Sequence, residues 1–308
     1  MRNAVSGLHH VTALSSDARN TEAFLAETLG LRRVKKTVNF DAPEIYHLYY
    51  GDEIGRPGTV ITYFPFPDAA RGRPGTGEVS TTALSIPEGS AEDWIERLEA
   101  RGVAVERGEN GFGETRLQVA GPDGADLALV EDPGDTRAPW TEGGIPERMA
   151  IRGLHSVTLR LRDSDATIAL LRFMGYEQIE VCDEVTRLAI TDGTAGIVDV
   201  EVAEDMPPAS QGAGSVHHVA FSVATRARQL EMRAELVSAG YDVTPPIDRD
   251  YFWAIYFRSP GGVLFEIATD EPGFERDEDR ETLGRALKLP AQHEYLRERL
   301  ERELVDLG

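Results

Sequence analysis

The hydrophobic and polar positions repeat one order four times along the chain. A short segment rich in β-branched and apolar residues comes first, beginning at Gly7, Ser80, Gly153 and Ser215. An amphipathic stretch follows, and it ends at a glycine, the residue expected just after a helix: Gly30, Gly102, Gly175 and Gly240. Two or three further strand candidates come after each glycine, as in residues 31–38, 44–50 and 59–64. The pattern therefore predicts four βαβββ units.

One such unit cannot bury both faces of its small sheet, so the units are expected to pair. Consecutive units would form an N-terminal domain over residues 1–131 and a C-terminal domain over 151–270. A linker rich in Pro and Gly over 132–150 separates them. Residues 271–308 form an acidic tail with a charged terminal helix, expected to dock on the second domain or on a partner subunit.

Charge and cysteine content exclude several classes of function. Acidic residues outnumber basic ones 53 to 32, giving a net charge of −21, and only three of the basic residues are lysine. Such a surface argues against nucleic acid or an anionic membrane as partner. Cys182 is the single cysteine, so intramolecular disulfides and cysteine-based zinc sites are excluded, and we expect a reduced, cytoplasmic setting. No apolar run approaches the roughly 20 residues of a membrane span.

Two histidine pairs occupy equivalent places in the first and fourth units: His9 with His10, and His217 with His218. Neighbouring side chains on a strand face opposite ways, so one member of each pair should face a shared site. Val219, Phe221 and Val223 form an apolar row suited to packing beneath a helix, which leaves His218 on the open face. The same parity places His10 and Thr12 on the open face of the first strand.

Glu266 alternates with an apolar row in the last strand of the fourth unit, and parity turns it toward His218. A carboxylate among apolar residues is costly to bury unless it is paired or binds a cation. Two imidazoles and one carboxylate are the ligand set of non-haem Fe(II) oxygenases, and variations suit Mn, Ni or Zn. The alternative is that these histidines are packed, hydrogen-bonded core residues.

The other units lack this combination, so one metal site is expected. Ser156 stands at the His10 position of the third unit, and His155 matches His9. Ala128 and Tyr63 follow a proline by the same spacing that separates Glu266 from Pro260, so they are the expected counterparts of that glutamate.

At these residues the chain resembles the vicinal oxygen chelate superfamily, which includes glyoxalase I, bleomycin-resistance proteins and extradiol dioxygenases. Within it the chain is most similar to the hydroquinone-type ring-cleaving dioxygenases, typified by dichlorohydroquinone 1,2-dioxygenase. The most specific matches are GLHHVT, the run from Ile45, VHHVAF, the run from Tyr251 and LGRALKLP. The resemblance covers nearly the whole chain.

The resemblance implies an α+β vicinal oxygen chelate fold with four βαβββ modules paired into two domains. It implies a mononuclear Fe(II), with Mn(II) as an alternative, held by His10, His218 and Glu266, with O2 as co-substrate. Further site residues implied by the resemblance are His9, Thr12, His217, Arg249 and Tyr256. Because strand alternation turns His9 and His217 away, a twist at the strand start would be needed to bring them in.

The implied reaction is ring opening of a small aromatic diol of the hydroquinone type, and a homo-oligomer is possible. Two alternatives remain open: a glyoxalase-like isomerase or thiol transferase, and a non-catalytic protein that binds an aromatic compound. The lack of a second carboxylate ligand weighs against the first, and the complete triad weighs against the second. Of the remaining candidates, His47 is expected to be structural, His293 exposed and Cys182 inert.

Overall fold

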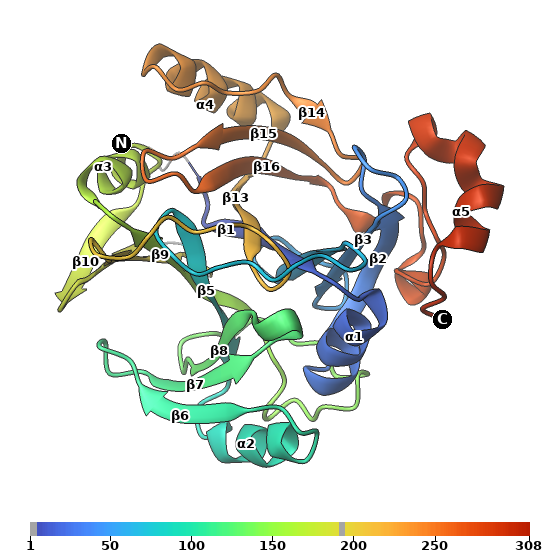
Figure 1. The fold of residues 1–308 in the computed structure, drawn as a ribbon, viewed down its shortest axis with the longest axis horizontal. Helices are drawn as coiled ribbons and strands as arrows, with labels where there is room; N and C mark the ends of the chain where they lie inside the picture. Colours follow the sequence, from blue (N-terminus) through green and yellow to red (C-terminus); the bar gives the residue numbers. More distant parts are fainter. Residues whose placement is uncertain (1–4, 191–194) are drawn as a thin grey trace.

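The computed structural model describes residues 5–190 and 195–308, and the four predicted βαβββ units are present (Figure 1). The first unit contains β1 (Leu8–Ser15), α1 (Ala18–Glu22), the π-helix η1 (Ala23–Thr28), β2 (Arg32–Val38), β3 (Tyr46–Gly51) and β4 (Val60–Pro65). The second contains β5 (Glu78–Ile86), α2 (Ala91–Glu99), β6 (Val105–Glu109), β7 (Thr115–Ala120), η2 (Pro122–Gly124) and β8 (Asp126–Glu131).

The second half of the chain repeats this order. The third unit contains β9 (Gly153–Leu161), α3 (Asp165–Phe173), β10 (Glu177–Cys182), β11 (Val185–Ala189) and β12 (Ile197–Val202). The fourth contains β13 (Val216–Val223), α4 (Arg226–Ser238), β14 (Ile247–Asp248), β15 (Phe252–Arg258) and β16 (Leu264–Pro272). The tail contains η3 (Phe274–Arg276), η4 (Arg280–Thr282), η5 (Ala291–Leu296) and α5 (Arg297–Glu303). Among these described helices, none is both long and apolar enough to cross a bilayer.

Strand alternation separates two sets of side chains on β13. Val219, Phe221 and Val223 belong to the main core cluster, together with Met232 and Leu236 of α4. Ala220 belongs instead to a smaller cluster on the opposite face of the sheet. The predicted apolar row therefore does pack beneath a helix, and the other face is left for the site.

The units pair differently from the expectation. One eight-stranded sheet has the order β14-β15-β16-β13-β1-β4-β3-β2 and combines the fourth unit with the first. The other has the order β10-β11-β12-β9-β5-β8-β7-β6 and combines the third with the second. Consecutive units were expected to pair, and for the two sheets this is wrong. The domain boundaries at 131 and 151 stay a prediction, and the strand pairing within the sheets does not coincide with them.

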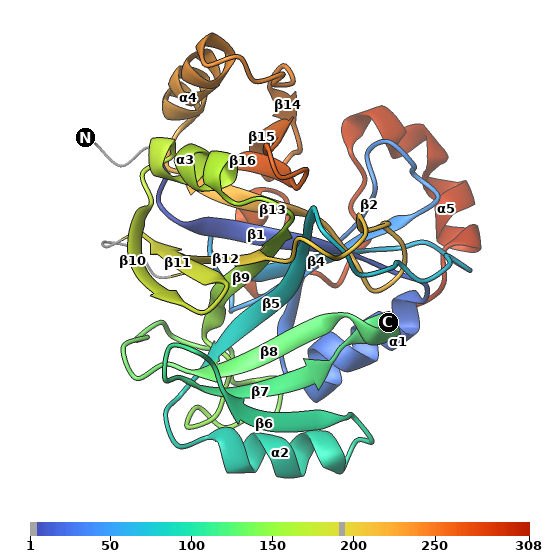
Figure 2. The same cartoon turned by 60° about the vertical axis from the view of Figure 1, so that its left-hand side comes forward.

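The connections between units explain this exchange. The first strand of each unit has a free edge that can hydrogen-bond to the first strand of any other unit. The local sequence therefore does not determine which unit becomes the partner. Two segments connect the sheets: residues 66–77 lead from β4 to β5, and residues 203–215 lead from β12 to β13. They lie side by side, since isolated bridges join Arg71 to Ala213, Arg73 to Ser210 and Thr76 to Pro208. After this crossing β13 returns beside β1, while β5 and β9 pair with each other (Figure 2).

The tail docks on β2 of the first unit (Figure 1). It also contacts the fourth unit just before β15, where the Tyr251 hydroxyl donates to Asp277 at 3.1 Å. Lys35, wholly buried, donates to Asp277 and Glu278 at 2.6 and 2.5 Å. Arg33 donates to the Gly284 carbonyl, and a Cβ at Gly284 would collide with the Arg33 carbonyl oxygen. The tail is therefore an integral edge of the first sheet.

Near the end of the tail, His293 is half-buried rather than exposed, since its Nε2 lies 2.8 Å from the Phe40 carbonyl oxygen. Phe40 belongs to the loop between β2 and β3, so the tail also contacts this loop.

Candidate metal centre and its cavity

Three neighbouring strands of the first sheet bring His10, His218 and Glu266 together. In the register of β1 with β13, His10 lies opposite Ala220, and Ala220 lies opposite Glu266 in the register of β13 with β16. His218 is two residues before Ala220, so it faces the same side of the sheet. One ligand atom from each of the three side chains lies within 4.8 Å of the other two.

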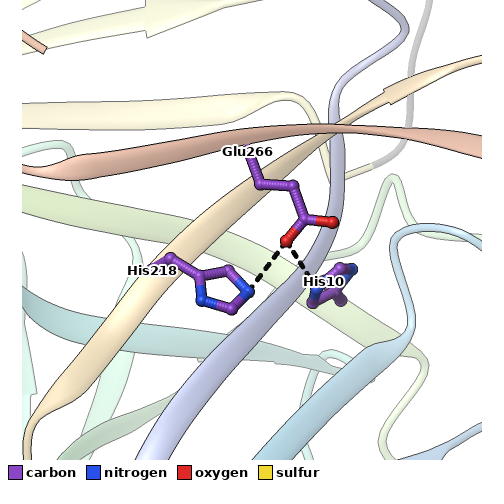
Figure 3. Close-up of side chains that lie close together, drawn as sticks. All are labelled: His10, His218 and Glu266. Carbon is purple, nitrogen blue, oxygen red and sulfur yellow. Dashed lines mark ion pairs between the residues drawn. The ribbon is translucent and has the colours of Figure 1, made fainter. Parts of the chain in front are cut away.

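The three side chains are aimed at one point (Figure 3). Nε2 of His218 lies 2.9 Å from Oε2 of Glu266, and Nε2 of His10 lies 3.5 Å from the same oxygen. Glu266 is 0% exposed, and its other carboxylate oxygen, Oε1, has no hydrogen-bond partner among the described residues. Burial opposes the charge of Glu266, but His10 and His218 hold its pKa well below the usual range. An ionised, buried carboxylate facing two imidazoles is a donor set that fits a divalent cation.

His9 and His217 each contact the ring of the histidine that follows. Nδ1 of His9 lies 2.9 Å from Nδ1 of His10, and Nδ1 of His217 lies 2.7 Å from Nδ1 of His218. Burial, followed by the charge of the neighbouring histidine, lowers the pKa of His9 to about 3 and that of His217 to about 4. Both rings are therefore neutral near pH 7, and Nδ1 of each can accept a hydrogen bond from Nδ1–H of the histidine that follows. Such an acceptor leaves Nε2 of His10 and His218 free as a ligand atom.

The register of β1 with β13 is irregular between Leu8 and His10, at the position of His9, whose ring contacts that of His10. His9 does not line the main cavity, whereas His217 does. His9 lines a smaller cavity behind the triad, beside Tyr251 and Asp270.

A cavity of about 520 Å³ opens beside the three side chains. Its walls are mostly aromatic, with Phe40, Tyr49, Phe64, Phe66, Phe252 and Tyr256. Arg249 is half-buried in this wall, with Nε 3.4 Å from the Tyr256 hydroxyl and Nη2 3.5 Å from Asp41. Burial and the charge of Glu266 raise the pKa of Tyr256, so its hydroxyl stays protonated. The cavity can thus hold a flat apolar molecule next to one guanidinium.

Thr12 lies beneath the cavity floor and does not line it. Its hydroxyl is fully buried and accepts from the hydroxyl of Thr62 at 3.3 Å. The register places Thr62 opposite Thr12 as Glu266 lies opposite Ala220, so Thr62 is the counterpart of Glu266 in the first unit. The expectation for Tyr63 is wrong by one position, because Tyr63 packs in the core on the other face.

His47 was expected to be structural, yet it lines the cavity together with Tyr49. A signal was present in the alternation of β3: Tyr46, Leu48 and Tyr50 belong to the main core, which turns His47 and Tyr49 to the other face. Without knowing that β3 joins the same sheet as β13, the sequence could not connect these two residues with the triad.

The second sheet carries ion pairs at the corresponding place. Ser156, Thr81 and Ala128 hold the positions of His10, His218 and Glu266. Arg187 pairs there with Asp199 at 2.8 Å and with Glu114 at 2.8 Å, and His155 lies 3.4 Å from Glu114. Within the described part of the chain, His10, His218 and Glu266 are the one group with metal-ligand geometry.

Comparison with known proteins agrees with this arrangement. The family model described as "Glyoxalase/Bleomycin resistance protein/Dioxygenase superfamily" matches residues 7–137 and 125–267. A Bacillus subtilis protein named "Putative ring-cleaving dioxygenase MhqE" is 41% identical over 304 residues, covering 98% of this chain and 99% of that protein. The "Chlorohydroquinone/hydroquinone 1,2-dioxygenase" of Sphingobium indicum is 36% identical over 311 residues, covering 98% and 97%.

Among solved structures, a crystal structure titled as a putative dioxygenase from Bacillus subtilis superposes with a TM-score of 0.95 at 39% identity. The superposition covers 99% of this chain and 98% of that one.

Proposed function

The chain belongs to the glyoxalase/bleomycin resistance protein/dioxygenase superfamily, and from that premise we propose that it is an Fe(II)-dependent dioxygenase that opens hydroquinone-type rings with O2. The observation that carries the proposal is the buried triad of His10, His218 and Glu266 at the edge of an aromatic cavity. The names of the relatives point to the same chemistry.

The three side chains would hold the iron and leave its other positions open. Fe(II) bound there would supply coordination sites for a ring oxygen and for O2. The counterpart position Thr62 carries a hydroxyl that is already hydrogen-bonded to His47, so the first unit adds no second carboxylate and no fourth ligand. This observation favours an oxygenase over a glyoxalase-like isomerase, and Mn(II) remains an alternative metal for the same ligand set.

The remaining residues bind and orient the substrate. The phenylalanine rings of the cavity pack against the aromatic ring and exclude water. Arg249 stabilises negative charge that develops on the ring oxygens, because its guanidinium is half-buried and points into the cavity wall. His217 is a neutral imidazole in the cavity, and with Nδ1 accepting from His218 its Nε2–H can donate a hydrogen bond to an oxygen of the ring. Both atoms of O2 enter the product, an acid of the muconic-semialdehyde type.

The test is O2 uptake by protein loaded with Fe(II) under anaerobic conditions. Methylhydroquinone, catechol and a metal-free control are compared, and the opened product is identified by mass. Iron-dependent uptake with the para-diol supports the proposal. Uptake with catechol alone would reject the hydroquinone class, and uptake with neither would reject the oxygenase.

Glu266→Gln should abolish uptake, since the substitution removes the anionic ligand while keeping the side-chain shape. Thr81→Ala is the matched control, because Thr81 occupies the His218 position in the second sheet. Its uptake should equal that of the unmodified protein.

A further inference from the structure

The wall of the cavity formed by β3 carries one polar pair among aromatic rings. The Tyr49 hydroxyl lies 2.8 Å from Nδ1 of His47, and the two rings are tilted by 34° with centroids 4.0 Å apart. Nε2 of His47 lies 2.6 Å from the Thr62 hydroxyl, which in turn contacts Thr12. Both His47 and Tyr49 are buried and both line the cavity.

The contacts give this chain a direction. Burial lowers the pKa of His47 well below its usual value and raises that of Tyr49, so the imidazole is neutral and the phenol is protonated. A neutral imidazole has one N–H and one acceptor nitrogen. We assign the His47 proton to Nε2, so that Nε2–H donates to the Thr62 hydroxyl and Thr62 donates to Thr12. Nδ1 of His47 then accepts a hydrogen bond from the Tyr49 hydroxyl.

The Tyr49 oxygen consequently has its proton engaged and its lone pairs free. Phenolic oxygens accept as well as donate, so this atom is an acceptor for a hydroxyl that enters the cavity. Arg249 is the cation of the wall and Tyr256 is bonded to it, which leaves the Tyr49 oxygen as a neutral acceptor.

The pair lies on the opposite side of β1 from β13 and β16, the strands of His218 and Glu266. Tyr49 lies opposite Thr62, and Thr62 lies opposite Thr12, so Tyr49 is two strands, about 10 Å, from Thr12, which follows His10 by two residues. A ring bound through one oxygen beside His10 can direct its opposite edge toward β3. An ortho-diol has its second hydroxyl next to the first and cannot place it there.

We propose that Tyr49 is a specificity-determining residue whose hydroxyl oxygen accepts a hydrogen bond from the second hydroxyl of a para-diol. His47 is the positioning residue: it accepts a hydrogen bond from the Tyr49 hydroxyl and so leaves the lone pairs of that oxygen free to accept. The proposal rests on the hydroquinone class of substrate proposed above and assigns the side chain that selects it.

The experiment measures binding separately from turnover. Protein loaded with Zn(II), which does not activate O2, is titrated by calorimetry with hydroquinone and with phenol, which lacks the second hydroxyl. The unmodified protein should bind the diol about tenfold more tightly, a ratio equivalent to about 1.4 kcal/mol. Tyr49→Phe removes one oxygen atom and should bring this ratio close to one, with phenol affinity unchanged.

Three further variants separate recognition from folding. Tyr63→Phe is the matched control, since it removes the hydroxyl of a buried tyrosine on β4 that does not line this cavity. The ratio of diol affinity to monophenol affinity should stay near ten in this variant. In His47→Leu this ratio should fall close to one, and in His47→Gln, whose amide can both accept and donate, it should be partly restored.

Kinetics with Fe(II) provides a second readout. Tyr49→Phe should raise KM for methylhydroquinone more than it lowers kcat. A ratio in Tyr49→Phe equal to that of the unmodified protein would overturn the assignment even if O2 uptake is normal. Absence of O2 uptake with a normal, Tyr49-dependent ratio would instead reject the proposed reaction and keep the recognition site.

Discussion

Metal binding should stabilise the folded protein by an amount that Glu266 controls. The three ligand atoms converge only in the folded sheet, because β1, β13 and β16 come from distant parts of the chain. A ligand that binds only the folded state stabilises it by RT ln(1 + [L]/Kd), which is about 2.7 kcal/mol at a free concentration of 100 Kd. The unmodified protein should gain about this amount in Zn(II) or in anaerobic Fe(II).

Glu266→Gln keeps the shape of the side chain and removes its charge. If the loss of this anionic ligand weakens binding a hundredfold, the same free metal equals the new Kd and stabilises by only about 0.4 kcal/mol. The predicted difference between the two proteins is therefore about 2.3 kcal/mol at one metal concentration.

The assay is urea unfolding followed by circular dichroism, in buffered free Zn(II) and in chelator. Thr81→Ala, at the His218 position of the second sheet, should gain as much from the metal as the unmodified protein. The reasoning is refuted if chelator and metal give the same unfolding midpoint, or if Glu266→Gln gains the full amount.

Two predictions concern ion pairs outside the cavity. Lys35→Met should lower the free energy of unfolding, measured in urea, by about 3 kcal/mol or more, since it leaves Glu278 buried without its cation. The double variant Lys35→Met with Glu278→Gln should recover part of this loss. If the losses of the two single variants simply add in the double variant, the pairing is contradicted. In the second sheet, burial would raise the pKa of Glu114, but His155 and Arg187 lower it to about 2. Because the folded pKa lies below the unfolded value, this stabilisation is complete above about pH 4.5 and is lost as pH falls toward 2. The stability difference between the unmodified protein and Glu114→Gln should shrink over that range, and a constant difference from pH 6 to pH 2.5 would contradict it.

The sequence by itself determined the repeated units and the faces of their strands. Alternation is a local property of extended backbone, so the apolar row of β13 was enough to place His218 on the open face and, with β16, to turn Glu266 toward it. The helix ends at glycines were local in the same way. These features depend on residues a few positions apart, which a single sequence displays directly.

Only the tertiary structure decided which units share a sheet, where the tail docks and which residues form the rest of the cavity. The free edge of β1 could pair with any first strand, and the crossing of two connecting segments selected β13, about two hundred residues away. That pairing carries β3 into the same sheet as the triad and makes His47 and Tyr49 part of the cavity wall. It also leaves Arg187 and its carboxylates to fill the second sheet. Such contacts join positions distant in the chain, and their energies depend on complementary surfaces that exist only after the units have folded.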